Sequence, residues 1–332
     1  MSRFALILSG ILMLCGLGAI SLPLPAANAQ PAADRAFPAR PLRIVVPFTT
    51  GSTSDAASRF FAEQLAGELG QSVYVENRAG ANGIIAIQTL RAAPADGHTI
   101  LLGAISLMSI NPIAVKDLPY DPVKDLAPIS GLARGMNVIV VAADSEIRTL
   151  ADFVALAKAA NPALTSGSFA PGYTLSTAWL GQLAGFRFTA VPYKGQAAVL
   201  TDLIGRQLDF ALVDIGGALP LVKTGKLRAL AVTGEARHPE IPDVPSARES
   251  GYPDFVRYSW GGFYVRSDTP ARLIERLADA MQNVLAKPES AQFAARQAQE
   301  LLPLRPAAMR QYQLDELARM RAVANSIGYA PQ

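Results

Sequence analysis

Cysteine and histidine are almost absent from this chain. Among its 332 residues there is one cysteine, Cys15, and there are two histidines, His98 and His238. Zinc sites built from clustered Cys and His, iron–sulfur clusters and disulfide scaffolds all need more of these residues, so these classes are nearly excluded. The sequence therefore predicts a protein without a metal and without a cofactor.

An excess of charge of one sign is also missing. The 30 Lys and Arg residues and the 27 Asp and Glu residues leave a net charge of +3, which is too small to indicate a nucleic-acid binder. Charged residues make up 17% of the chain and hydrophobic residues 50%, the reverse of the balance in a disordered chain. We expect a folded protein with room for two domains of ordinary size and no nucleic-acid partner.

The motifs of common enzymes are lacking too. There is no G-x-x-x-x-G-K-[ST] phosphate loop, no G-x-S-x-G nucleophile elbow and no H-E-x-x-H, and no G-x-G-x-x-G follows a predicted strand. His98 is expected in a surface turn and His238 in a loop, so a Ser–His–Asp triad has no evident base. A protein that is not an enzyme is predicted, and an exported hydrolase is kept as an alternative.

The N-terminal segment has the three parts of a secretory signal peptide. Arg3 supplies the positive charge, residues 4–20 form an uncharged apolar run, and the small residues of Ala27-Asn28-Ala29 form a cleavage site. A membrane anchor is the alternative, but glycines interrupt the run and Pro23 follows it. Residues 1–29 are predicted to be removed after Ala29 on export to the periplasm. The mature charge is then 29 − 27 = +2, because Arg3 is lost.

The body of the chain alternates between predicted strands and helices. A β-branched run at residues 43–48 is followed by a helix ending at Gly70, and the pattern repeats through a strand at 72–76, a helix at 84–91 and a strand at 99–102. This order is typical of a parallel sheet with helices on both faces. A proline-rich stretch at 111–128 is predicted to be a long loop.

A second alternation runs from the strand at 138–141 to the strand at 230–232, and three helices without further strands follow residue 270. These helices need a sheet to cover, and the first alternation is the nearest. We therefore expect an α/β fold of two lobes, each a sheet flanked by helices. Lobe 1 comprises residues 30–136 and 257–332, and lobe 2 is inserted at 137–256. The two crossings, near 135–137 and 256–259, would form a hinge beside a ligand cleft.

Two polar loops follow predicted strands and lead into predicted helices. The first is Phe48-Thr49-Thr50-Gly51-Ser52-Thr53-Ser54-Asp55, and the second is Ser166-Gly167-Ser168-Phe169-Ala170-Pro171-Gly172-Tyr173-Thr174. Free N–H groups and hydroxyls at the start of a helix can hold an anion without a charged side chain. The ordinary alternative for the first loop is helix capping by Thr53 or Ser54, and for Phe48 it is core packing.

Seven short segments, in this order, resemble one known family. They are Pro41-Leu42-Arg43-Ile44-Val45-Val46-Pro47-Phe48, Val75-Glu76-Asn77-Arg78-Ala79-Gly80-Ala81, Pro94-Ala95-Asp96-Gly97-His98-Thr99, Leu118-Pro119-Tyr120-Asp121-Pro122, Val191-Pro192-Tyr193-Lys194-Gly195, Gly225-Lys226-Leu227-Arg228-Ala229-Leu230-Ala231-Val232-Thr233 and Ile241-Pro242-Asp243-Val244-Pro245. The chain is similar to the periplasmic solute-binding proteins of the tripartite tricarboxylate transporter system, the Bug (Bordetella uptake) family.

This resemblance implies a Venus-flytrap fold that captures a small organic carboxylate and delivers it to membrane permease subunits. It also implies that both loops hold the carboxylate, that the family's Asp after the glycines matches Asp55, and that an acid and an aromatic match Asp214 and Trp260. A monomer is expected. The candidate ligand-binding residues are Phe48, Thr49, Thr50, Gly51, Ser52, Thr53, Asp55, Ser106, Ser168, Gly172, Tyr173, Thr174, Asp214 and Trp260.

The chain departs from the family pattern at three places. Ser52 and Asn82 stand where the family usually has glycines, and Leu175-Ser176 stand where it often has a His. Neither loop holds an arginine clamp, so a mono- or dicarboxylate, including an aromatic acid or an amino acid, is expected rather than a tricarboxylate. A component that presents its ligand to a sensory system is the second alternative function.

Overall fold

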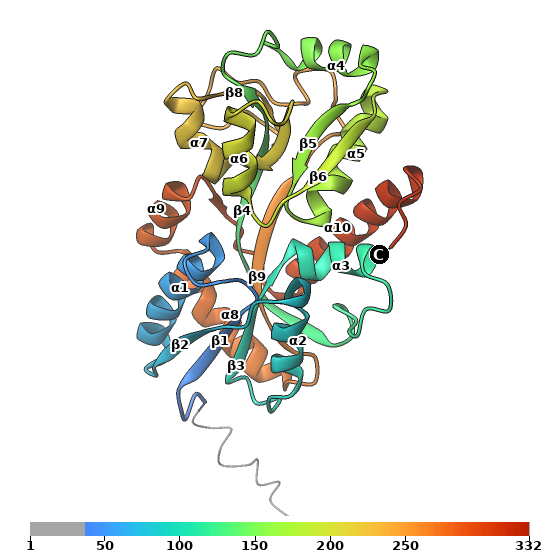
Figure 1. The fold of residues 1–332 in the computed structure, drawn as a ribbon. Helices are drawn as coiled ribbons and strands as arrows, with labels where there is room; N and C mark the ends of the chain where they lie inside the picture. The colour runs from blue at the N-terminus through green and yellow to red at the C-terminus, as the bar shows by residue number, and fades with distance from the viewer. Residues whose placement is uncertain (1–36, 332) are drawn as a thin grey trace, which may run out of the picture. The chain divides into compact units, whose positions relative to one another are not determined.

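The computed structural model describes residues 37–331, so the predicted signal peptide lies outside the described residues. The described chain is a mixed α/β fold, which confirms the predicted class. Figure 1 shows its elements in two groups, a lower and an upper one, with the strands β4 (Leu126–Ala142) and β9 (Tyr258–Arg266) running between them. None of the described helices is both long enough and apolar enough to cross a membrane.

The lower group holds both the first and the last elements of the described chain. Its members besides β4 and β9 are β1 (Leu42–Val46), α1 (Thr53–Leu69), β2 (Val73–Asn77), η2 (Ala81–Gly83), α2 (Ile84–Arg91), β3 (Thr99–Ala104), η3 (Ser106–Ile110), α3 (Asn111–Ala114), α8 (Ala271–Leu285), α9 (Pro288–Arg296), β10 (Glu300–Leu301) and α10 (Pro306–Ser326). The C-terminal helices thus lie with the first elements of the chain. This was expected, because no long strand follows residue 270 for these helices to cover.

The sheet of the lower group is mixed rather than parallel. Its strand order is β10-β4-β9-β3-β1-β2. β1 pairs with β2 and β3 in parallel, as predicted, whereas β9 pairs with both β3 and β4 in the antiparallel sense. The parallel arrangement predicted for the first alternation is therefore confirmed, and the sheet becomes mixed because β9 comes from a later part of the chain and inserts between β3 and β4.

The strand β4 is longer than the sequence indicates. It spans 17 residues, about 55 Å of extended chain, and its first part replaces the end of the predicted 111–128 loop. It pairs with β9 up to Met136 and with β7 and β8 from Asn137 and Val138 onward. One continuous strand therefore belongs to the sheets of both groups.

The upper group follows β4 in the chain. It consists of α4 (Leu150–Ala159), β5 (Leu164–Ser168), α5 (Pro171–Ala184), β6 (Phe188–Pro192), α6 (Gln196–Ile204), β7 (Ala211–Asp214), α7 (Ile215–Lys223) and β8 (Leu227–Val232). β5 and β6 form a parallel pair, joined to β7 by a single bridge between Ser166 and Phe210. The chain passes from the carboxyl end of β5 through a short loop directly into α5.

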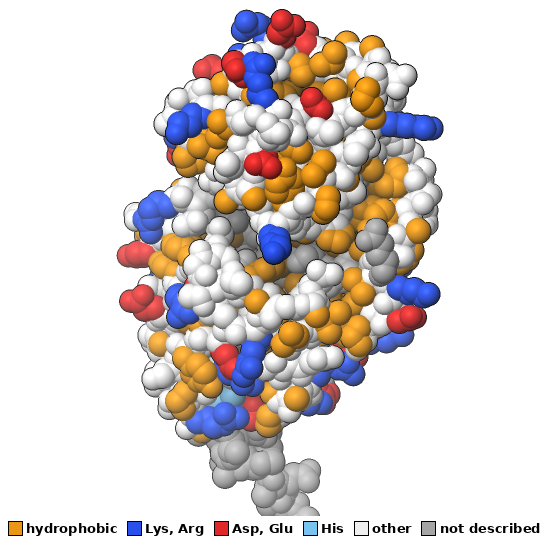
Figure 2. Space-filling view, in the orientation of Figure 1, with side chains coloured by type: hydrophobic (Ala, Val, Ile, Leu, Met, Phe, Trp, Pro, Cys, Tyr) orange, Lys and Arg blue, Asp and Glu red, His pale blue; other side chains and the backbone are white. Residues whose placement is uncertain are grey.

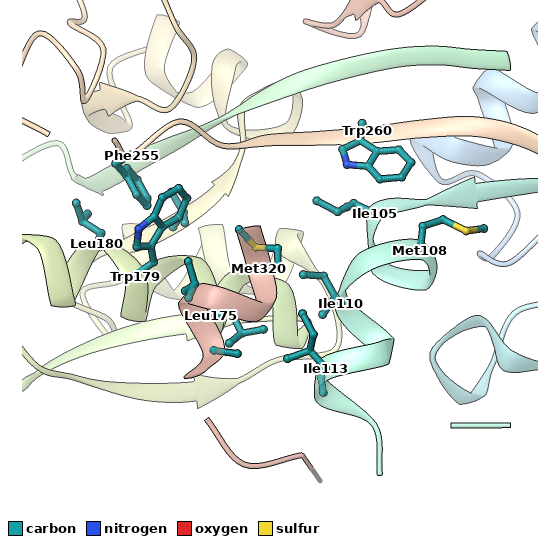
Figure 3. Close-up of a cluster of buried hydrophobic side chains, with 14 of the residues drawn as sticks. Ile105, Met108, Ile110, Ile113, Leu175, Trp179, Leu180, Phe255, Trp260 and Met320 are labelled. Atoms are coloured by element: carbon teal, nitrogen blue, oxygen red, sulfur yellow. The ribbon is translucent and has the colours of Figure 1, made fainter. Parts of the chain in front are cut away.

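A shared apolar core lies where the two groups meet. Figure 3 shows Ile110 and Ile113 beside Leu175 of α5 and Met320 of α10, with Trp179 and Phe255 packed further along the same cluster. The rings of Trp179 and Phe255 meet edge to face at 5.0 Å between centroids. On the face that Figure 2 shows, basic and acidic side chains alternate without a large patch of one sign.

Candidate functional site

The loop between β1 and α1 is organised around the carboxylate of Asp55. Oδ2 of Asp55 accepts hydrogen bonds from the N–H of Gly51 at 3.0 Å and from Nε of Arg59 at 3.1 Å, and Oδ1 accepts one from Nδ2 of Asn77 at 2.9 Å. Asn77 also donates to the carbonyl of Phe48 at 3.1 Å. The side chain of Asp55 is 3% exposed, so it is a buried tie that holds this loop in shape.

The pKa of Asp55 reflects this environment. Burial alone raises it, but the hydrogen bonds from Arg59, from the Gly51 N–H and from Asn77 outweigh burial and hold the pKa below its usual range. Asp55 is thus ionised at neutral pH. An ionised carboxylate accepts and does not donate, so Asp55 would repel an anion in direct contact and favour it only by positioning the Gly51 loop.

Ser52 is the N-cap of α1, and its Oγ accepts from the N–H of Asp55 at 3.2 Å. The expectation that Thr53 or Ser54 would be the cap was therefore wrong by one or two residues. Gly51, at φ +84°, turns the loop into the helix. Thr49, Thr50 and Thr53 are exposed, and their hydroxyls are on the surface of the loop.

The loop between β5 and α5 forms a second cluster of hydroxyl groups. The hydroxyls of Ser168 and Thr174 share a hydrogen bond of 2.7 Å. Tyr173 donates its hydroxyl to Oδ2 of Asp214 at 2.6 Å, and its ring packs on Phe169 with 4.0 Å between centroids. Burial and the neighbouring Asp214 carboxylate both raise the pKa of Tyr173, so it stays a donor at all physiological pH values.

Asp214 connects this second cluster to the two long strands. Its Oδ1 accepts from Nδ2 of Asn137 at 2.8 Å and from the hydroxyl of Ser259 at 2.7 Å. Asn137 lies on β4 and Ser259 on β9. One carboxylate therefore joins α5, β4 and β9 at the point where β4 changes partners.

Ser106 and Trp260 lie on the lower-group side of the same region. Ser106 begins η3, a π-helical turn, and is half-buried. Trp260 is 3% exposed and meets the ring of Tyr312 edge to face at 5.5 Å, and Figure 3 shows its indole beside Ile105. Its Nε1 is enclosed without a hydrogen-bond partner.

The structure thus places ten of the fourteen predicted residues in two clusters. One contains Phe48, Thr50, Gly51, Ser52 and Asp55, and the other contains Ser168, Gly172, Tyr173, Thr174 and Asp214. The remaining four, Thr49, Thr53, Ser106 and Trp260, belong to neither cluster. Within residues 37–331 no hydrogen bond or ion pair connects the first cluster to the second. Both clusters lie at a strand end that leads into a helix, the position at which α/β folds bind ligands.

Known proteins are similar to this chain over most of its length. Residues 57–329 match the Tripartite tricarboxylate transporter family receptor, TctC. The chain belongs to this receptor family.

Three relatives of the TctC receptor illustrate the match. Protein BugT of Bordetella pertussis is 30% identical over 304 residues, which cover 90% of this chain and 93% of BugT. The solved structure of R. palustris Rpa4515 with adipate is 30% identical and has a TM-score of 0.81, covering 89% of this chain and all of that one. MatC of Rhodopseudomonas palustris with bound malate is 27% identical, with a TM-score of 0.75, covering 86% and 99%.

The family and the fold are therefore those of periplasmic solute-binding receptors, not of enzymes. The Bug resemblance and the two-lobed binding-protein class are confirmed by these matches. The expectation that His98 lies in a surface turn was wrong, because His98 is buried and meets the ring of Phe37 edge to face at 4.9 Å. Among the described residues, no three His, Cys, Asp or Glu side chains are grouped so that they could hold a metal ion.

One buried charged residue, Arg257, is not among the candidates predicted from the sequence. Arg257 directly precedes β9 and is 3% exposed, and its Nε donates to the hydroxyl of Ser176 at 2.8 Å. Arg257 lies in neither of the two polar loops and in none of the seven segments that resemble the family. The available signal was a charged residue between Val256 and Tyr258, inside the predicted crossing at 256–259.

Two hollows lie away from both clusters. One, of about 490 Å³, is lined by residues of the upper group that include Arg148 and Asp243. The other, of about 90 Å³, is lined by residues that include Arg134 and His238. Neither is lined by a predicted site residue, and α5 is instead packed closely on the lower group near Ile110.

Proposed function

We propose that this receptor captures a small organic mono- or dicarboxylate between the two groups of elements in the periplasm and delivers it to the permease subunits of a tripartite tricarboxylate-type transporter, without catalysing a reaction. The observation that carries the proposal is the cluster of hydroxyls and helix start at Ser168–Thr174. It is accompanied by family membership and by relatives whose structures contain adipate and malate.

We also propose that the two groups move as lobes, with lobe 1 at residues 30–136 and 257–332 and lobe 2 at 137–256. The pairing of β4 supports these boundaries, because its partner is β9 as far as Met136 and β7 from Asn137. A carboxylate held by both loops would favour the closed form, since only that form brings the two loops to one ligand.

The test is a thermal-shift panel of organic acids and amino acids on the mature protein, unfolded and refolded to remove any bound ligand. At about 100 times its Kd, a ligand should add about 2.7 kcal/mol, which for a chain of this size is a shift of about 4 °C. A shift with adipate or malate supports the proposal. A panel without any shift contradicts carboxylate capture, and a shift with citrate far above all simpler acids contradicts the ligand class.

Ser168→Ala removes the hydroxyl bonded to Thr174 and should weaken binding of the acid found in the panel without lowering the unfolding temperature of the ligand-free protein. The matched control is Thr89→Ala, which removes an exposed hydroxyl of α2 bonded to the carbonyl of Ile85. Equal affinities in both variants would mean that the α5 loop does not contact the ligand.

A further inference from the structure

Arg257 is more deeply buried than any other basic side chain of residues 37–331. Among these residues it is the single Lys or Arg that is buried, with 3% of its surface exposed. No carboxylate of the described chain lies within 4.0 Å of its guanidinium. Removing a charge from water costs several kcal/mol unless a partner compensates, so a buried guanidinium without a carboxylate needs an explanation.

Two of the three guanidinium nitrogens of Arg257 are fixed by the protein. Nε donates to the hydroxyl of Ser176, which in turn donates to the carbonyl of Gly172 at 2.7 Å, and Nη1 donates to the carbonyl of Tyr258. Because the guanidinium is planar and held at two points, the direction of its third nitrogen, Nη2, is fixed as well.

Nη2 has no hydrogen-bond partner among the residues that the structure describes. It also differs from the enclosed atoms that lack a partner, such as Nε1 of Trp260, because it is not sealed from solvent. Other partly buried arginines are saturated: both Nη atoms of Arg228 donate to carbonyls in the turn before α4, and both Nη atoms of Arg310 donate to protein oxygens.

The start of α5 beside Nη2 is also unsatisfied. Its N-cap is Ala170, which offers no side-chain acceptor, whereas α1 is capped by Ser52 and α4 by Thr149. Within the described chain the N–H of Gly172 has no acceptor. A Cβ placed on Gly172 would lie 3.6 Å from Nη2 and 3.3 Å from the side chain of Ile110, so the residue with the free N–H lies next to the free guanidinium nitrogen, at the contact between α5 and η3.

We propose that Nη2 of Arg257 and the N–H of Gly172 together bind one carboxylate of a dianionic ligand, which makes Arg257 the residue that selects dicarboxylates. This inference rests on the proposed function above. A carboxylate accepts two parallel hydrogen bonds from such a pair of donors, and both the helix start and the guanidinium attract negative charge. The second carboxylate of the ligand is left to the uncharged Gly51–Thr53 loop.

The charges that face Arg257 agree with this assignment. Asp214, the acidic group bonded to the Tyr173 hydroxyl, is already bonded to Asn137 and Ser259 as well. The ligand carboxylate would therefore be the direct counter-ion of Arg257. Ser176 is a positioning residue, because it touches the guanidinium rather than the ligand.

The experiment compares adipate with monomethyl adipate, which has the same chain and one charge fewer, by isothermal titration of the mature protein. The wild type should bind adipate at least about 10-fold more tightly than the monoester. Arg257→Met should lose about 30-fold or more of the adipate affinity, the usual loss when one partner of a buried charge pair is truncated. The ratio of the two ligands should fall to about 1.

Arg228→Met is the matched control, because this arginine is saturated by backbone carbonyls of the upper group. It should lower the unfolding temperature and leave the adipate-to-monoester ratio unchanged. Arg257→Lys, which keeps the charge and the fold but not the planar geometry, should give an intermediate ratio and keeps the proposal testable where Arg257→Met does not fold.

The outcomes separate the two proposals. A wild type that binds no acid of the panel overturns the proposed function. A wild type that binds adipate, together with an Arg257→Met variant that keeps its affinity and its ratio, overturns the role of Arg257 alone. An unchanged ratio in Arg257→Lys together with a lowered ratio in Arg228→Met would also contradict it.

Discussion

Asp55 is a carboxylate whose oxygens are committed to the protein before any ligand arrives. Its partners are the Gly51 N–H, Arg59 and Asn77, so its contribution is to the shape of the loop. A buried, hydrogen-bonded carboxylate with a lowered pKa also stabilises the folded state at neutral pH. The contribution of Asp55 to stability therefore depends on pH.

Asp55→Asn should lower the free energy of unfolding at pH 7 by about 1–3 kcal/mol, because it removes charge-assisted hydrogen bonds in a buried position. The folded pKa of Asp55 lies below the unfolded value of about 3.9. The stability that ionised Asp55 contributes is thus fully present above this unfolded value and is lost as the pH falls through the folded pKa. Urea unfolding of both proteins from pH 7 to pH 3.5 should show a difference that narrows at the acidic end.

The matched control is Asp254→Asn, which changes an exposed carboxylate whose side chain has no hydrogen bond within the described chain. It should leave the unfolding free energy unchanged at every pH. A difference between wild type and Asp55→Asn that is constant down to pH 3.5 would show that the charge of Asp55 is not what stabilises the loop.

At this scale the sequence predicts residues that sit in recognisable loops and misses those that reach a site from elsewhere. Asp55 follows a strand and Gly51, Asp214 ends a strand, and the family resemblance matches both to acidic positions of the family. Arg257 and Asn137 act from strands that cross between the groups, and Asn77 ends a neighbouring strand. Their roles depend on contacts between residues that are far apart in the sequence. Arg257 and Ser176, for example, are 81 residues apart, and no local pattern indicates that they touch.

A row of glycines crosses the middle of the lower sheet. Gly103 of β3 pairs with Gly262 of β9, which pairs with Gly131 of β4. A Cβ at Gly103 would lie 2.5 Å from the ring of Tyr264, and one at Gly131 would lie 2.3 Å from the carbonyl oxygen of Leu302. Three neighbouring strands therefore lack side chains at one level, and the residues that cover the sheet pack directly on its backbone.

Gly103→Ala should destabilise the protein by about 1–3 kcal/mol, the usual effect of overpacking a core, because the ring of Tyr264 is fully buried and cannot move away. Gly67→Ala should stabilise it by about 0.5–1 kcal/mol, since Gly67 is in the interior of α1 with no heavy atom near its Cβ position. Equilibrium unfolding of the two variants measures the change in the free energy of unfolding, which should be negative for Gly103→Ala and positive for Gly67→Ala. Equal effects would mean that the glycine row is not tightly packed.

Elements with a clear local signal could be predicted closely. The helix at 84–91 is found at those residues, and Gly70 ends α1 in the left-handed conformation, at φ 66°. The length of β4 and the place of β9 within the sheet could not be predicted, because β4 continues through residues 126–137, where Pro128 and two glycines weaken the β pattern. Pairing with β9 overrides that local preference.

The whole molecule is predicted to lose residues 1–29 on export. Expression of the full chain in a Gram-negative host should give a periplasmic protein. Its intact mass should be that of a chain that begins at Gln30. This mature chain contains no cysteine, since Cys15 is removed, and should not react with thiol reagents. A membrane-bound product that retains Arg3 and Cys15 would instead support the anchor.

The central position of β9 sets the order in which such a chain can acquire its structure. Residues 143–232 of the upper group are contiguous and can pair as soon as they leave the translocation channel. The lower sheet, by contrast, remains in two halves, β1–β3 on one side and β4 on the other, until residues 258–266 emerge and join them. Until then both halves expose unpaired strand edges, which are sites of aggregation. Residues 258–266 thus determine whether the strands at residues 42–104 reach their native sheet, so C-terminal truncations that remove β9 should accumulate as insoluble protein.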